Sequence, residues 1–240
     1  IKKGRFDIAF SHYSDCEEFE NKANTKFIFL PCSVNKDKFN IQDTNYQNVK
    51  KHDLCFSGLL QNPYMRKKNK NLFALRKKIQ TEFYFQLFDI PLFLKKKYKN
   101  KSIFWNAYQE SSVKNAILKL SNKYKRLSFD NYIDMFRLSK VTLNTLSPFN
   151  LIGPRYFECM LLKSINFCEQ SKYYSKIFKE FEHYIPFRPD LSDFSEMFEY
   201  ASSDSPDIKK IIEASYTLVV EKHTYDKRAD DLIQHARNII

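Results

Sequence analysis

The sequence has no apolar run of about 18 residues, the length needed for a helix that crosses a bilayer. It also has no secretory signal-peptide pattern. No CxxC pair, HExxH motif or His/Cys cluster at metal-ligand spacing is present, so no metal site is predicted. Glycine is scarce, with three residues against 23 phenylalanines and 15 tyrosines. An AT-rich genome explains that bias as readily as any function does.

The cysteines do not form a disulfide pattern. They are odd in number, scattered along the chain and mostly placed in apolar runs. We therefore predict buried free thiols in a reducing compartment. They are Cys16, Cys32, Cys55, Cys159 and Cys168.

Basic residues outnumber acidic ones, 40 to 28, which leaves a formal net charge of +12. That excess favours anionic partners, namely nucleotide sugars, phospholipid surfaces or nucleic acid, and it does not choose among them. Many lysines occur in runs such as Lys95 to Lys97, and a solvated face is the simplest interpretation of such a run.

The pattern of apolar residues predicts alternating strands and helices, and therefore an α/β fold with a Rossmann-like parallel sheet. We predict strands at 6–10, 26–30, 53–56, 83–88, 102–107, 126–129, 141–146 and 165–168. We predict helices at 14–22, 64–79, 112–122, 131–137, 192–202, 206–222 and 225–239, and others that begin at 155 and near 172. Asp130 and Asn131 are the expected cap of one helix, and Asp204 or Ser205 of another.

Residues 140–169 form the most informative stretch. The strand at 141–146 leads into a loop with Asn150 and Gly153, and a helix opens at Arg155 with Glu158 in its first turn. Free N–H groups at such a helix start can hold a phosphate or pyrophosphate, to which Arg155 adds a forked cation. Glu158 can accept two hydrogen bonds from a vicinal diol such as a ribose. These groups suit a nucleotide diphosphate.

Each of these features also has a purely structural interpretation. Glu158 can simply complement the helix dipole, Arg155 can be a surface charge, and Gly153 with Pro154 can be an ordinary helix lead-in. The spacing alone leaves both interpretations open.

The segment GPRYFECMLLKSINFCE resembles the nucleotide-binding motif of GT-B glycosyltransferases, particularly the spore-maturation (CgeB-like) group. Two further segments fit that family in order, DLCFSGLLQNPYMRKKNKNLFAL and EKHTYDKRADDLI, so the resemblance covers about residues 53–240. Retaining members commonly have two glutamates eight positions apart. The second matches Glu158, which would bind the ribose, whereas the first position holds Asn150, which brings no charge. The sequence therefore does not predict whether the anomeric configuration is retained.

The resemblance also implies a domain organisation. LPCSVNKDKF, residues 30–39, is similar to the GT-B crossover between two domains, although a plain loop after a strand is the alternative. Residues 1–45 are then the end of an N-terminal, acceptor-side domain, and 46–222 a nucleotide-sugar-binding domain. Residues 223–240 would be a C-terminal helix that packs back across the junction. Because the sequence begins at Ile1, we expect an upstream portion that carries the acceptor site and any catalytic base.

Other residues receive weaker predictions. Gly58 follows a predicted strand and would let a ligand approach the backbone, and Arg66 matches a family position that reaches a donor phosphate. Glu169 can contact a sugar hydroxyl or cap the helix near Lys172, and the cap is slightly favoured. His183 is expected to be a structural hydrogen-bonding residue.

The resemblance therefore implies a metal-independent glycosyltransferase that needs no cofactor and uses a UDP- or GDP-sugar, as in cell-surface polysaccharide synthesis. The acceptor would be a glycan, a lipid-linked molecule or a protein. We expect a cytoplasmic location and leave peripheral contact with a membrane open. Two alternatives remain: transfer of another nucleotide-activated group on the same scaffold, and nucleic-acid binding through residues 66–78 and 95–101, which is disfavoured.

Overall fold

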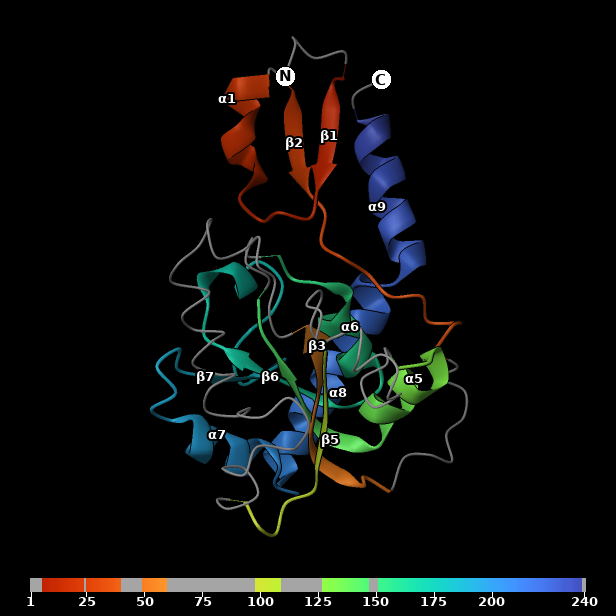
Figure 1. Cartoon of the computed structure of the whole chain (residues 1–240). Helices are drawn as coiled ribbons and strands as arrows, with labels where there is room; N and C mark the ends of the chain where they lie inside the picture. Colours follow the sequence, from red (N-terminus) through yellow and green to blue (C-terminus); the bar gives the residue numbers. More distant parts are fainter. Residues whose placement is uncertain are drawn as a thin grey trace, which may run out of the picture.

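The computed structural model describes residues 6–23, 25–39, 49–59, 98–108, 127–146 and 151–238 (Figure 1). The helices predicted at 64–79 and 112–122, the strand predicted at 83–88 and the lysine run 95–97 lie outside these ranges. In the described part of the chain, no helix combines the length and the apolar character needed to cross a bilayer.

The described elements alternate as the sequence predicts. The strands are β1 Ile8–Ser11, β2 Lys26–Phe29, β3 His52–Leu59, β4 Ile103–Tyr108, β5 Ser139–Asn144, β6 Ile165–Glu169 and β7 Ile185–Phe187. The helices are η1 Cys16–Phe19, α1 Glu20–Ala23, α5 Phe129–Arg137, α6 Pro154–Leu161, η4 Lys172–Tyr174, α7 Phe194–Ala201, α8 Pro206–Lys222 and α9 Tyr225–Arg237.

Five parallel strands form the main sheet in the order β4-β3-β5-β6-β7, which confirms the predicted α/β fold. The chain runs from β3 outward to β4 and then returns to the other side of β3 to form β5. This reversal makes the carboxyl ends of β3 and β5 the topological switch point, where open parallel sheets bind their ligands.

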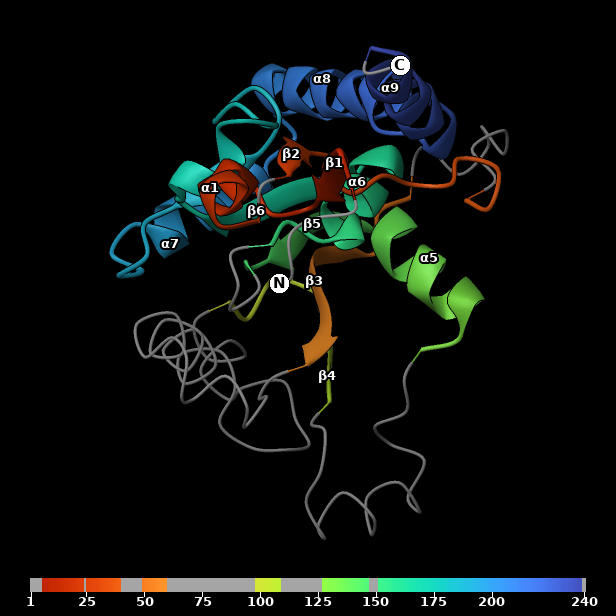
Figure 2. The same cartoon turned by 90° about the horizontal axis from the view of Figure 1, so that it is seen from above.

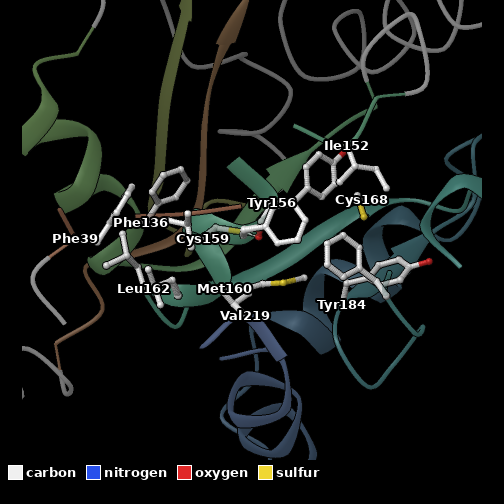
Figure 3. Close-up of a cluster of buried hydrophobic side chains, with 14 of the residues drawn as sticks. Phe39, Phe136, Ile152, Tyr156, Cys159, Met160, Leu162, Cys168, Tyr184 and Val219 are labelled. Atoms are coloured by element: carbon white, nitrogen blue, oxygen red, sulfur yellow. Dashed lines mark hydrogen bonds between the residues drawn. The ribbon is translucent and has the colours of Figure 1, made fainter. Parts of the chain in front are cut away.

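Alternation of side chains along the strands builds two apolar layers. Leu54 and Phe56 of β3 face a layer with α7 and the start of α8, whereas Cys55 faces a layer with α5 and α6. Figures 1 and 2 show α7 and α5 on opposite sides of the sheet. Figure 3 shows the second layer, in which Tyr156, Cys159 and other α6 side chains lie among residues from several elements. The sheet is thus covered on both faces, as an all-parallel sheet requires.

Several predicted boundaries are wrong. The predicted strand at 126–129 is not formed, because Phe129 is the first residue of α5 and the two described residues before it are not in a strand. Ser128 caps α5, accepting a hydrogen bond from the N–H of Asn131 at 3.3 Å, in place of the expected Asp130 or Asn131. β3 continues through Gly58 to Leu59, beyond the predicted end. β7 was not predicted at all, since its three residues include a proline.

Other predictions are confirmed. α8 has the predicted bounds and Ser205 is its cap. All five cysteines are free, and all except the partly exposed Cys32 are buried. His183 accepts a hydrogen bond from the backbone N–H of Lys179 at 3.1 Å, which is the structural role expected of it.

A separate two-stranded parallel sheet, β1-β2, precedes the main sheet. α9 runs alongside it in Figure 1, and the rings of Phe10 and His235 lie 6.2 Å apart. Below this sheet residues 30–39 pair with the chain between α8 and α9. The N–H of Val34 donates to the carbonyl of His223 at 2.9 Å, and the N–H of Tyr225 donates to the carbonyl of Val34 at 3.0 Å.

Arg228 stabilises the chain between α8 and α9, at the point where that chain pairs with Val34. Its Nη1 pairs with Asp231 at 2.6 Å, and its Nη2 donates to Nδ1 of His223 at 2.9 Å. Because arginine only donates, Nδ1 must be an unprotonated acceptor. Burial, aided by the charges of Arg228, Lys222 and His183, lowers the pKa of His223 from 6.5 to about 4. The ring of His223 also packs on Phe157 of α6, with centroids 4.8 Å apart.

The buried His223 makes the stability of the protein depend on pH. Since the folded pKa of His223 lies below its unfolded value, the unfolded chain binds more protons between about pH 6.5 and 4. Neutral His223 contributes its full share to the free energy of unfolding above pH 6.5. As the pH falls to about 4, this contribution is lost, and the free energy of unfolding decreases by roughly 3 kcal/mol at most. We expect the free energy of unfolding, measured by urea titration at several pH values, to fall less steeply in His223→Asn. His235→Asn is the control, and equal slopes in the wild type and His223→Asn would contradict this.

Candidate functional site

At the carboxyl end of β3, the backbone of Gly58 lies against the side chain of Arg155. A Cβ placed on Gly58 would come within 3.1 Å of Nη1 of Arg155 and within 3.1 Å of Cζ of Phe56. A side chain at position 58 would therefore displace the guanidinium or the ring by a few tenths of an ångström. At Gly153, in contrast, an added Cβ would meet nothing within 4 Å.

The β3 and β5 strands separate where this contact occurs. Their pairing reaches Cys55 and Thr142, whereas the pairing of β3 with β4 continues to Leu59. Two residues that the sequence places almost a hundred positions apart, Gly58 and Arg155, are thus brought together at the switch point.

Arg155 is half-buried, and its Nε atom is fully buried without a hydrogen-bond partner in the described part of the chain. Within the same ranges, no ion pair joins it to a carboxylate. Its charge nevertheless lowers the pKa values of the neighbouring Glu158 and Tyr132, against the larger effect of burial. Arg155 is therefore a partly dehydrated cation suited to an anionic ligand.

The start of α6 supplies fewer backbone donors than the sequence led us to expect. The helix begins at Pro154, which has no N–H, and Gly153 caps it without a side chain. The N–H of Tyr156 donates to the carbonyl of Gly153 at 3.3 Å. Anion binding at this helix start must therefore rely more on the guanidinium of Arg155 than on free backbone groups.

Glu158 lies one turn into α6 and not in its first turn as predicted, because the helix begins at Pro154; its side chain is half-buried. The hydroxyl of Tyr132, on α5, donates to its Oε2 atom at 2.6 Å. Burial raises the pKa of Glu158, while the bond from Tyr132 and the charge of Arg155 oppose that rise. Burial raises the pKa of Cys32, and the charge of Glu158 adds to that rise, so the carboxylate lies near Cys32.

Glu169, at the end of β6, has a different role from the one favoured by the sequence. Its Oε1 atom accepts a hydrogen bond from the N–H of Leu146 at 2.8 Å, and its side chain is buried. The expected cap role is wrong, because Ser171 caps η4 by accepting from the N–H of Tyr173 at 3.4 Å. Glu169 thus anchors the chain as it leaves β5, directly before the loop that leads to α6.

Four of the six predicted binding residues, Gly58, Gly153, Arg155 and Glu158, lie in the described ranges, around the carboxyl end of β3 and the start of α6. Arg66 and Asn150 lie outside the described residues. Tyr132 was not among the predicted site residues. The sequence does contain a signal for it, because the hydroxyl of a tyrosine at a core-facing helix position needs a hydrogen-bond partner.

A pocket of about 250 Å³ lies elsewhere, at the amino ends of β5 and β6. It is lined by apolar residues and by Lys50, Lys140, Lys209 and Asp204. Lys140 pairs with Asp204 at 3.2 Å, and Lys50 donates to the carbonyl of Lys163 at the end of α6 at 3.0 Å. Burial lowers the pKa of Lys50 to about 8. Lys50 and Lys140 thus have structural contacts at the end of the sheet opposite Arg155.

Among the described residues, no group of three His, Cys, Asp or Glu side chains is arranged to hold a metal ion. The polar groups at the switch point are instead a guanidinium, a carboxylate and a phenol. That set can bind an anion through Arg155 and hydroxyl groups through Glu158.

A family of glycosyl transferase-like proteins matches residues 97–234, which is more than half of the chain. The chain belongs to this glycosyl transferase-like family. The match includes α5, β5, α6 and β6, and therefore Tyr132, Arg155 and Glu158. No curated protein matches the sequence.

Solved GT-B glycosyltransferases have the same fold. A glycosyltransferase from Rickettsia africae has a TM-score of 0.61 at 14% identity, covering 97% of this chain and 62% of its own. Sucrose-phosphate synthase from Thermosynechococcus elongatus has a TM-score of 0.58 at 11% identity, with 97% and 58% covered. HepE from Anabaena, solved in complex with UDP, has a TM-score of 0.59 at 8% identity, with 97% and 64% covered. The chain thus spans about 58 to 64% of these proteins.

The anchoring role of Glu169 can be tested by stability. Glu169→Ala leaves the N–H of Leu146 without its acceptor in a buried site, which should cost about 1–3 kcal/mol of unfolding free energy. Glu182→Ala, which removes an exposed carboxylate paired with Lys179, should cost less than about 1 kcal/mol. Chemical denaturation of both variants measures the difference, and equal losses would contradict the role assigned to Glu169.

Proposed function

We propose that this protein is a glycosyltransferase that transfers a sugar from a nucleotide-diphosphate sugar to a glycan, a lipid-linked molecule or a protein. One observation carries the proposal: Arg155 and Glu158 lie one turn apart on α6, and the guanidinium lies against the bare backbone of Gly58 at the switch point. Membership of the glycosyl transferase-like family supports it. So does the likeness in fold to HepE, which was solved with UDP.

Each residue of the proposed donor site has a distinct role. Arg155 binds the diphosphate, and the N-terminal end of α6 adds the positive pole of its dipole. Glu158 accepts hydrogen bonds from the ribose hydroxyls. Asn150 would bind the donor sugar and Arg66 a phosphate, as the resemblance implies. When the glycosidic bond to the diphosphate breaks, the guanidinium stabilises the charge that develops on the leaving group.

Finer assignments belong to the same proposal. The guanidinium and the helix dipole offset the leaving-group charge, so we propose that no metal is required. We place the protein in the CgeB-like group, in the cytoplasm at or near the inner face of a membrane, where its excess of basic residues would meet anionic lipids.

We also propose a domain division near residue 45. The separation of the β1-β2 sheet from the five-stranded sheet supports it, as does the pairing of Val34 with Thr224 across the junction. Residues 1–45 would then belong to the acceptor side, 46–222 to the donor-binding domain, and 223–240 to a helix that links the two. Packing of α9 beside β1 agrees with the last assignment.

Thermal protection by nucleotide tests the proposed donor site. At about 100 times Kd, UDP or GDP should add about 2.7 kcal/mol of stability, which raises Tm by roughly 5–10 °C. Glu158→Ala should abolish most of this shift, because the ribose loses its acceptor. Glu213→Ala, which removes a surface carboxylate paired with Lys163, should keep the shift.

Three outcomes would count against the proposed function. They are an unchanged Tm with both nucleotides, equal protection of the wild type and Glu158→Ala, and salt-dependent binding of polynucleotides that ignores Glu158. The last result would favour a nucleic-acid-binding protein.

The Gly58 contact gives an independent test. In Gly58→Ala the new methyl group must displace the guanidinium of Arg155 or the ring of Phe56 by a few tenths of an ångström. We expect UDP to bind several-fold more weakly, while Tm without ligand changes by only a few degrees. Isothermal titration calorimetry measures the affinity. Unchanged affinity in Gly58→Ala would show that the position of Arg155 does not matter for binding.

A further inference from the structure

Glu158 has a partner whose role goes beyond packing. The hydroxyl of Tyr132 donates to Oε2 of Glu158 at 2.6 Å, a length typical of a bond to an ionised carboxylate. In the described part of the chain, no hydrogen bond reaches the other oxygen, Oε1. One oxygen is thus held by the protein while the other remains available to a ligand.

The tyrosine is itself fixed in place. Its ring packs edge-on against Phe136, with centroids 4.8 Å apart, and contacts the apolar layer around α6. The helix that carries it is held by a hydrogen bond from Arg137 to the carbonyl of Phe39 at 2.6 Å and by the Ser128 cap. A donor on such a support can define the orientation of a carboxylate.

The environment of Glu158 would otherwise favour a neutral carboxyl group. Burial raises its pKa, and the nearby thiols Cys32 and Cys159 are themselves made harder to ionise by its charge. Tyr132 on α5 and Arg155 on α6 are the two groups that favour its ionised form.

We infer that Tyr132 is a positioning residue, which holds the carboxylate of Glu158 turned so that its other oxygen accepts hydrogen bonds from the ribose of the nucleotide. This inference rests on the proposed function. Tyr132 does not contact the nucleotide in this account. It acts only through the carboxylate, so it determines how strongly the site prefers a ribose to a deoxyribose.

Tyr132→Phe tests the inference, because it removes one oxygen atom and keeps the ring. Affinities for UDP and 2′-deoxy-UDP are measured by isothermal titration calorimetry. In the wild type, UDP should bind more tightly than 2′-deoxy-UDP. In Tyr132→Phe, UDP should bind about tenfold more weakly, and the preference for ribose should shrink. Tyr216→Phe, the same change on a partly buried tyrosine of α8, should alter neither value.

Two further readouts separate positioning from a structural effect. The ratio of mutant to wild-type affinity for UDP should fall as the pH is lowered, because Glu158 loses a bond that favours its ionised form. Taking the ratio cancels ionisation of the nucleotide itself. In a Glu158→Ala background, Tyr132→Phe should have no further effect on affinity.

The outcomes are distinguishable. If the wild type binds neither UDP nor GDP, the proposed function fails and this inference fails with it. If the wild type binds UDP with a preference for ribose and Tyr132→Phe keeps the same affinity, preference and pH profile, only the inference is overturned. Equal weakening of both nucleotides together with a lower Tm would assign Tyr132 a structural role and would also overturn it.

Discussion

The candidate site depends on the contact between the guanidinium of Arg155 and the bare backbone of Gly58. Parallel strand order places the carboxyl ends of β3 and β5 side by side at the switch point, and the separation of these strands leaves room for one long side chain. A residue with a Cβ at position 58 would be in close contact with that cation. The fold therefore places a positive charge at the end of the sheet where open α/β proteins bind ligands. Because Pro154 at the start of α6 has no N–H to donate, binding of an anion there depends more on this charge.

The pKa of Glu158 reflects opposing effects of burial and of neighbouring side chains. Burial alone would favour a neutral Glu158, whereas Tyr132 and Arg155 favour the carboxylate. A carboxylate and a guanidinium without a direct ion pair between them are both available to a ligand that carries hydroxyl groups and phosphates. Farther along the chain, burial and the nearby charge of Arg228 keep His223 neutral, and His223 packs on the helix that carries Glu158. Support for the site thus extends to the chain between α8 and α9.

Much of the fold could be predicted from the sequence, because periodic apolar runs such as those of β5, β6 and α8 carry strong local signals. Strand β7 was missed because three residues with a central proline carry little signal, and the start of α5 was misplaced because Phe129 suits a strand as well as a helix. The pairing of position 155 with Glu158 could be predicted from helical spacing. The contacts of Arg155 with Gly58 and of Glu158 with Tyr132 could not, since they join residues 97 and 26 positions apart. Only the three-dimensional fold brings these residues together.

The family match and the GT-B fold establish what kind of protein this is, and the proposed donor site adds which groups would bind the nucleotide. The most direct test is a crystal structure of the chain with UDP bound. We expect electron density for the diphosphate against the guanidinium of Arg155, with a ribose hydroxyl within hydrogen-bond distance of Glu158. Density for UDP at the lysine-lined pocket on the opposite end of the sheet, with the switch point empty, would contradict it.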